Sequence, residues 1–578
     1  MVCGTSAKGI QSGINHALRE HVPSCQRFGK GVGCMRTQFV AKVVLLSTLF
    51  VPLTFAQTAP ASDSGIPKFT SRSELVMVPV VVTDKSGQHV KGLKKEDFAV
   101  LQNGKSMPIA VFDEINTQDT ALPPHQTPDG VFSNAVPTDN VSRRVMVIVM
   151  DLLNTPFADS ADARRALFNN AKVLIDAHIP VSLMVINSTG LHEIFGLHSD
   201  PRILETALDR VGTPNPTDLH ESATFGWDLG DKYLYNQYQE TVAQLQNSIG
   251  GPGTKLGTSN PNPEAAYQSY RTHHDVEITL FSLEQLAHAY SGIPGRKIMI
   301  WITGGLPMNI LDPTSISAYG DIMLDTYRRT FLVLNAANFS VYPVDAHGLG
   351  LESMSKHLNL TSTMNAFADA TGGTAFYNRN DIGVGIRNAV QDAVQYYEIG
   401  YYLPHESHGK PQWEKIKVKV DRKETAVRTR DGFFSGYSEK PEPKSLKMEM
   451  ELAFASPVAY TGFPIAIKVS ALASGANLTF DLTVPPRSFR IDRENNNFAN
   501  IEFAAVALGP HHQSSGIFAR RITGNLTLEN ADHIESQGFA MHDTITLPAN
   551  TNRVKFVIRD NLTGKIGSVV ARLNTNSK

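Results

Sequence analysis

Cysteine is almost absent from this 578-residue sequence, which contains only Cys3, Cys25 and Cys34. All three precede Met35, so a form of the protein that begins after them holds none. This absence excludes disulfides, thiolate metal sites and a cysteine nucleophile from the rest of the chain. The domains are therefore expected to rely on apolar cores for their stability.

An excess of basic residues is also missing, because 53 Lys and Arg stand against 55 Asp and Glu. Residues 1–56 carry six of the basic and one of the acidic residues, so their removal leaves 47 against 54. Nucleic-acid binding depends on basic side chains that neutralise phosphates. Nucleic acid is therefore not an expected partner.

Familiar catalytic motifs are lacking too. The sequence contains no His-Glu-x-x-His, no Gly-x-Ser-x-Gly elbow, no phosphate loop ending in Gly-Lys-Ser/Thr, and no Gly-x-Gly-x-x-Gly after a strand. We therefore expect a protein that is not an enzyme. Two alternatives stay open: an envelope hydrolase whose site is assembled from separate loops, and a purely structural envelope component.

No apolar run reaches the ~20 residues that a membrane-spanning helix needs. The run from Val43 to about Ala56 follows basic residues and is interrupted by polar residues and Pro52. This layout predicts a secretory signal peptide with cleavage after Ala56 and Met35 as the true start, and a membrane anchor is the alternative. The mature form is expected in the periplasm, cell envelope or medium, without a transmembrane span.

The remaining sequence is a mixture of α/β and β segments with clear changes in composition. Val/Ile-rich runs separated by turn residues predict strands, and a period of two in the last part predicts an antiparallel sandwich. The expected divisions are a linker (57–72), a β-module (73–116), a Pro-rich connector (117–142), an α/β domain (143–395) with an insertion at about 218–270, a β-hairpin extension (396–437), a linker (438–446) and an immunoglobulin-like β-sandwich (447–578).

The α/β domain alternates buried strands with amphipathic helices. Continuous apolar strands of this kind predict a parallel sheet that is covered by helices on both faces. The strands are expected at 143–151, 180–187, 297–303 and 339–345, and the helices at 161–178, 278–290 and 382–397.

Six segments in a fixed order resemble a known family. They are "VMDLLNTPF", "IPGRKIMIWITGG", "FSVYPVDAHGL", "ATGGTAFYNRND", "YYEIGYYLP" and "VRTRDGFF", and "VVVTDKSGQHVKGLKKEDFAVLQNGK" precedes them. Together they resemble the exported von Willebrand factor A-related proteins of Acidobacteria, over about residues 70–436. The resemblance implies a Rossmann-like A-type domain, and by analogy an adhesion-type role in binding a protein or cell-envelope ligand.

The resemblance also implies a candidate metal site. A-type domains that bind Mg²⁺ use an Asp-x-Ser-x-Ser turn, a later Thr and an Asp after the fourth strand, since hard cations prefer oxygen ligands. Here Asp151 and Thr155 match the ends of the turn, and the later Thr is Thr217 or Thr213. Leu153 replaces the middle Ser, and Gly304 stands in place of the later Asp. Such a degenerate site should bind Mg²⁺ or another divalent cation weakly, on the order of millimolar.

The carboxyl ends of parallel strands meet at one edge of a sheet. Asp151, Gly304 and the loop 213–218, with Thr213 and Asp218 as further donors, are therefore expected at the same edge. The alternative role for Asp151 is to cap the following helix or to order its loop, through backbone N–H groups near Pro156 and Phe157. Gly304→Asp with Leu153→Ser is expected to complete the ligand set, provided that the backbone at Gly304 tolerates a side chain.

Overall fold

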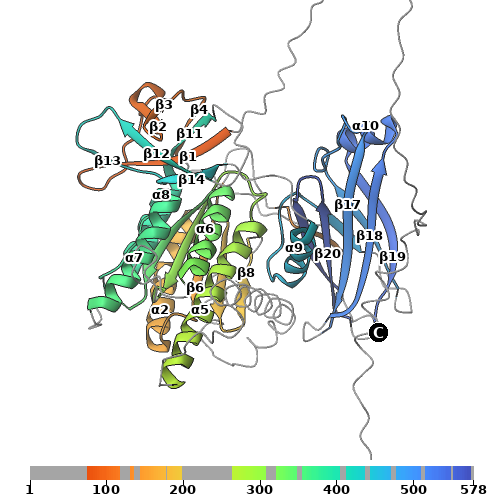
Figure 1. Cartoon of the computed structure of the whole chain (residues 1–578), viewed down its shortest axis with the longest axis horizontal. Helices are drawn as coiled ribbons and strands as arrows, with labels where there is room; N and C mark the ends of the chain where they lie inside the picture. The colour runs from red at the N-terminus through yellow and green to blue at the C-terminus, as the bar shows by residue number, and fades with distance from the viewer. Residues whose placement is uncertain are drawn as a thin grey trace, which may run out of the picture. The chain divides into compact units, whose positions relative to one another are not determined.

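The structure is a computed structural model, and many of its strands and helices are labelled in Figure 1. It describes residues 75–116, 130–135, 144–177, 179–197, 263–306, 320–347, 354–379, 381–403, 412–435, 443–469, 477–509, 514–548 and 551–573. All of them belong to one compact unit, Ser71–Lys578. The described chain is mixed α/β, rich in strands, and forms several sheets. The expected signal peptide and the linker 57–72 lie outside the described residues.

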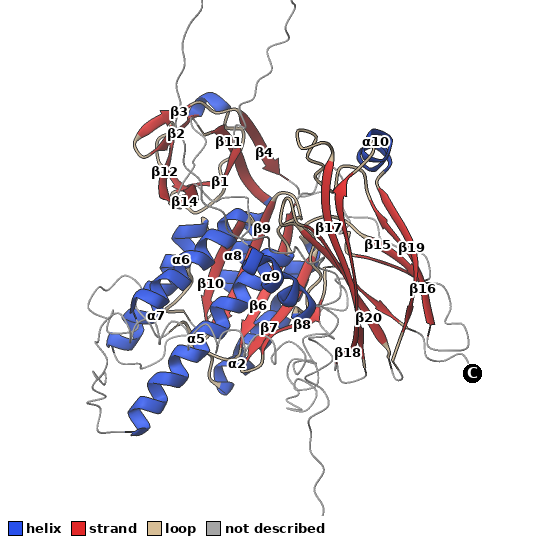
Figure 2. Cartoon of the chain, turned by 45° about the vertical axis from the view of Figure 1, so that its right-hand side comes forward, coloured by secondary structure: helices blue, strands red, loops and turns tan. Residues whose placement is uncertain are grey.

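A five-stranded sheet forms the centre of the α/β part, with the order β10-β9-β6-β7-β8. Four of these strands run parallel, and β8 is antiparallel to β7. Their bounds are β6 (Arg144–Asp151), β7 (Val181–Asn187), β8 (Gly190–Phe195), β9 (Arg296–Thr303) and β10 (Phe339–Asp345). Figure 2 shows these strands in red between blue helices.

Both faces of this sheet are apolar and covered by helices. On β6, Val147 and Val149 pack into one core with α5, α6 and α7, whereas Met146 and Ile148 pack into another core with α2 and α8. The predicted coverage on both sides is therefore confirmed. The helices are α2 (Phe157–Asp176), α5 (Pro263–Ala289), α6 (Gly320–Ala336), α7 (Met354–Thr371) and α8 (Gly383–Val394).

The helix predicted over 382–397 is wrong at its carboxyl end. Gln395 has extended backbone angles (φ −143°, ψ 111°) and begins strand β11 (Gln395–Tyr402). This strand pairs with β1 and β4, so cross-strand hydrogen bonds and buried Tyr397 override the helical pattern.

The early β-module and the segment after the α/β domain interleave their strands. One sheet has the order β13-β1-β11-β4, the other β14-β12-β2-β3, and a shared apolar core includes Val80, Val100 and Ile416. Segments that the composition separates, 73–116 and 396–437, therefore form one unit. The strands are β1 (Leu75–Asp84), β2 (Phe98–Gln102), β3 (Lys105–Met107), β4 (Val111–Asn116), β12 (Gln412–Val420), β13 (Thr425–Arg428) and β14 (Gly432–Ser435), with the short 3-10 helix Lys95–Asp97.

The carboxyl-terminal part contains two four-stranded antiparallel sheets, β19-β16-β15-β5 and β18-β17-β20-β21, which share an apolar core around Phe480 and Phe556. Strand β5 comes from the expected connector, and α9 begins in the expected linker 438–446. The elements are β5 (Val131–Ser133), α9 (Pro443–Ala455), β15 (Ala466–Val469), β16 (Asn477–Val484), β17 (Phe498–Leu508), β18 (Ser514–Asn525), α10 (Leu528–Gln537), β19 (Phe539–Thr546), β20 (Arg553–Asp560) and β21 (Ile566–Arg572).

These carboxyl-terminal sheets contact the α/β part at the end of α5. The backbone N–H and the hydroxyl of Thr461 both donate to the carbonyl oxygen of Ala289, at 2.7 Å each. Met450 and Ala453 of α9 belong to the same apolar cluster as α5. Among the described helices, none combines the length and the apolar character needed to cross a membrane.

Candidate functional site

The candidate site lies at the carboxyl edge of the parallel sheet, where β6 and β9 end side by side. The Thr303 hydroxyl donates to Asp151 Oδ2 at 2.8 Å, and the Gly304 N–H donates to Thr155 Oγ1 at 2.9 Å. The prediction that Asp151 and Gly304 share one edge is therefore confirmed. Thr217, together with Thr213 and Asp218, lies outside the described residues.

Asp151 is a buried carboxylate that is held by hydrogen-bond donors. Only 1% of the residue is exposed. The Asn154 backbone N–H donates to Oδ1 at 3.1 Å, and the Asn154 side-chain amide contacts both Oδ1 (3.1 Å) and Oδ2 (2.9 Å). Burial raises the pKa of Asp151, while the hydrogen bonds from Asn154 and Thr303 oppose part of this rise. Asp151 thus orders the loop after β6, as the alternative role proposed, but the backbone donor is the N–H of Asn154, earlier in the loop than the expected groups near Pro156 and Phe157.

Helix α5 contributes a residue to this edge that the sequence did not reveal. The Asn154 amide also donates to the Thr279 hydroxyl at 2.8 Å, and Thr279 in turn donates to the carbonyl oxygen of Asp275. Thr279 is fully buried. Asn154 and Thr279 are 125 residues apart, and a threonine within an apolar helix carries no motif that would mark it.

The two departures from the metal-binding pattern have structural reasons. A Cβ atom at Gly304 would lie 2.3 Å from the carbonyl oxygen of Asn154 and 2.5 Å from Cε1 of His347, which is far inside contact distance. Leu153 packs against the apolar cluster of α5 and the sheet. A side chain at Gly304 therefore requires the Asn154 backbone to shift, so the condition on which Gly304→Asp with Leu153→Ser was expected to complete a ligand set is not met.

His347 closes the edge beside Gly304. Its backbone N–H donates to Asp345 Oδ1 at 2.9 Å, and its ring Nδ1 lies 3.2 Å from the same oxygen. Its Nε2 lies 3.9 Å from Asp159 Oδ2 at the start of α2. Only 13% of the His347 side chain is exposed. The imidazole thus fills the space next to Gly304 between two carboxylates.

The donor set of the described edge fits a divalent ion poorly. Across the part of the chain that the structure describes, no three His, Cys, Asp or Glu side chains are grouped to hold a metal. To bind an ion, the Asp151 carboxylate would have to give up hydrogen bonds that it accepts from Asn154 and Thr303. The sequence expectation of weak Mg²⁺ binding through Asp151 and Thr155 is not tested by these contacts.

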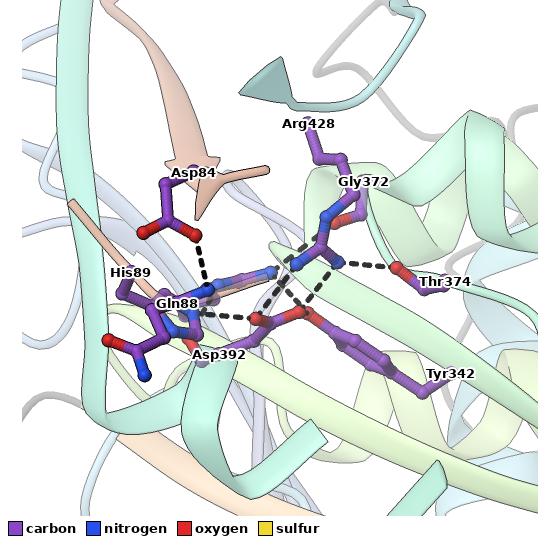
Figure 3. A network of polar contacts seen from close by, with 9 residues as sticks. Asp84, Gln88, His89, Tyr342, Gly372, Thr374, Asp392 and Arg428 are labelled. Atoms are coloured by element: carbon purple, nitrogen blue, oxygen red, sulfur yellow. Dashed lines mark hydrogen bonds and ion pairs between the residues drawn. The ribbon is translucent and has the colours of Figure 1, made fainter. Parts of the chain in front are cut away.

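A second polar network, drawn in Figure 3, was not expected from the sequence. Asp392 of α8 accepts hydrogen bonds from both Arg428 nitrogens (2.7 and 3.0 Å) and from the Tyr342 hydroxyl (2.9 Å). His89 Nε2 lies 2.8 Å from Asp392, and Arg296 donates to the Asp392 carbonyl oxygen. Burial alone would raise the pKa of Asp392, but His89, Arg428 and Arg296 lower it to about 2. The network joins the interleaved β-strands to the α/β sheet.

Comparisons with known proteins add little to this geometry. No family model matches the chain, and no curated protein matches it. Among solved structures, the TFIIH p34 N-terminal domain is similar at 10% identity and a TM-score of 0.19, covering 44% of this chain and 97% of that one. An endonuclease/exonuclease/phosphatase from Beutenbergia cavernae DSM 12333 is similar at 10% identity and a TM-score of 0.13, covering 32% of this chain and 39% of that one. Such low scores support no argument about fold or activity.

Proposed function

We propose that this chain is an exported, noncatalytic binding protein. In this proposal its α/β part is a degenerate von Willebrand A-type domain, and the carboxyl edge of the sheet meets a protein or cell-envelope ligand. Support for the A-type assignment comes from the strand order β10-β9-β6-β7-β8 with an antiparallel edge strand. The motif resemblance over residues 70–436 supports the same assignment.

The position of Asp151 is the observation on which the proposal depends most. From β6 the chain passes to β7 and β8 on one side, and it then returns to β9 on the other side of β6. Ligands of open α/β sheets bind in the crevice where the strand order reverses in this way. Asp151, Asn154 and Thr303 lie at that point, and Asp159 is a partly exposed carboxylate next to it.

A comparison of charge-reversal variants tests this function. The full mature chain and its Asp159→Lys variant are used to capture partners from envelope extracts, and Asp481→Lys on strand β16 is the control. A partner that the wild type and Asp481→Lys capture, and that Asp159→Lys does not capture, supports binding at the edge. Equal capture by all three proteins contradicts it.

Export is a separate part of the proposal and has its own measurement. The basic residues and apolar run before Gln57 support a cleaved signal peptide. Mass spectrometry of the extracellular or periplasmic protein should find an amino terminus near Gln57. Retention of residues 36–50 in that protein contradicts cleavage and favours an anchor.

A further inference from the structure

The side-chain nitrogen of Asn154 is surrounded by three oxygens at the candidate site. It lies 3.1 and 2.9 Å from the two carboxylate oxygens of Asp151, and 2.8 Å from the hydroxyl oxygen of Thr279. An amide nitrogen has two hydrogens to donate and accepts none. The Asn154 amide therefore occupies the position between these oxygens as a fixed, uncharged donor.

The hydrogen bonds described for Asp151 all point toward its oxygens. They come from the backbone and amide of Asn154 and from the Thr303 hydroxyl. A cation would need the same lone pairs, because hard cations bind carboxylate and hydroxyl oxygens directly. A cation and the Asn154 amide cannot both lie in front of the Asp151 carboxylate.

A missing metal ligand cannot be supplied by a side chain at Gly304. His347 packs its ring against Gly304, and the Asn154 carbonyl oxygen approaches the same glycine. No side chain can enter at position 304 without displacing one of them. The edge is thus closed both in front of Asp151 and beside it.

We propose that Asn154 is the built-in occupant of the cation position, and that this edge therefore binds its ligand without a divalent metal. This inference rests on the proposed binding function and deepens it. A metal bridge to a ligand carboxylate is excluded, so the ligand is held by ordinary hydrogen bonds and packing.

An isosteric substitution tests the role of Asn154. Asn154→Asp keeps the shape of the side chain but replaces the donor amide with a second carboxylate, which faces Asp151. Two carboxylates at about 3 Å repel unless a cation lies between them. Mn²⁺ should therefore raise the melting temperature of the full-chain Asn154→Asp protein by about 3 °C or more, and leave that of the wild type unchanged.

Two controls make the result specific, and a second variant covers the case in which Asn154→Asp does not fold. Asp151→Asn added to Asn154→Asp should abolish the Mn²⁺ response. Asn495→Asp, at an exposed position of the carboxyl-terminal part, should show no response. If Asn154→Asp does not fold, Asn154→Ser removes the amide and leaves a hydroxyl oxygen, and calorimetry should then detect Mn²⁺ binding at least about tenfold tighter than to the wild type.

Mn²⁺ binding to the wild type that is much tighter than the roughly millimolar level expected from the sequence, and that is lost in Asp151→Asn, would overturn the inference. A folded Asn154→Asp or Asn154→Ser protein that gains no Mn²⁺ binding would overturn it as well. Partner capture by the wild type in EDTA is a separate readout. If capture at the edge is real but is lost in EDTA, the binding function stands and the metal-free inference fails; if Asp159→Lys never changes capture, the binding function itself fails.

Discussion

At the scale of single residues, Gly304 determines what the carboxyl edge can contain. The sequence shows only that a glycine stands at the position where the metal-binding pattern of A-type domains has an aspartate. The structure adds that the carbonyl oxygen of Asn154 and the ring of His347 take the space of a side chain there. The glycine is therefore required by its neighbours.

The Gly304→Ala variant measures this requirement. The added methyl must displace a backbone carbonyl, so we expect a loss of about 2 kcal/mol or more in the free energy of unfolding, measured in urea. Gly196→Ala is the matched control, since its Cβ would meet only the flexible carboxylate end of Glu193 at 3.0 Å. That control should change stability by about 0.5 kcal/mol or less. Similar losses in both variants would argue against close packing at Gly304.

At the scale of elements, strand β5 shows how a short segment of the connector is fixed. Asn134 follows β5 and is 1% exposed. Its amide donates to the carbonyl oxygens of Tyr460 (2.6 Å) and Phe463 (3.0 Å), and its side-chain oxygen accepts from the Ile465 N–H (2.7 Å). One side chain thus joins the connector to the edge of the carboxyl-terminal sheet.

Asn134→Ala should leave buried backbone groups of this edge without partners. Unsatisfied buried groups cost about 1–3 kcal/mol each, so we expect a loss of about 3 kcal/mol in chemical unfolding. Faster proteolysis near β5 should accompany it. Asn495→Ala, with an exposed side chain, is the control and should behave like the wild type. An unchanged midpoint for Asn134→Ala would show that β5 is not held by this residue.

The Asp392 network connects α8, β10, β13 and the turn after β1, and it should be visible in the pH dependence of stability. The pKa of Asp392 is lowered from 3.8 to about 2 in the folded state. A lowered carboxyl pKa adds stability above the unfolded pKa, and this stability is lost as the pH falls through the folded pKa. The difference between the unfolded and folded pKa values corresponds to about 2 kcal/mol in the free energy of unfolding.

Asp392→Asn should therefore be much less stable than the wild type at pH 7. The difference in unfolding free energy between the wild type and Asp392→Asn should narrow by about 2 kcal/mol between pH 5 and pH 2, measured by urea unfolding at each pH. Asp481→Asn, whose carboxylate pairs with the exposed His542, is the control and should show no such change. A gap that is constant over this range would contradict the lowered pKa.

At the scale of the whole described chain, one apolar cluster continues from the α/β sheet into the carboxyl-terminal part. It contains Val147 of β6, Leu283 of α5, Ala453 of α9 and Val557 of β20. Because the cluster is shared, the two parts should unfold together rather than as independent domains.

Gly292→Ala should break this connection. The added Cβ would lie 1.5 Å from the carbonyl oxygen of Thr461, so the contact between the two parts has to open. Calorimetry should show one transition for the wild type and a lower or divided transition for the variant. An identical single transition for both proteins would show that the contact at Thr461 contributes nothing to cooperativity.

The sequence by itself determined the local features. Runs of Val and Ile that end at Asp151, Thr303 and Asp345 predicted parallel strands, because buried strands on both faces must be apolar along their whole length. The shared edge of Asp151 and Gly304 followed from the same rule. These features depend on nearest neighbours along the chain, which the sequence displays directly.

Only the tertiary structure decided which distant groups meet. The contacts of Asn154 with Thr279, of His347 with Gly304, and of Asp392 with Arg428 join residues that carry no shared motif. Strand β5 and the interleaved sheets likewise depend on long-range pairing, which propensity does not encode. The sequence therefore located the edge of the sheet, but the packing of remote side chains decided whether that edge has room for an ion.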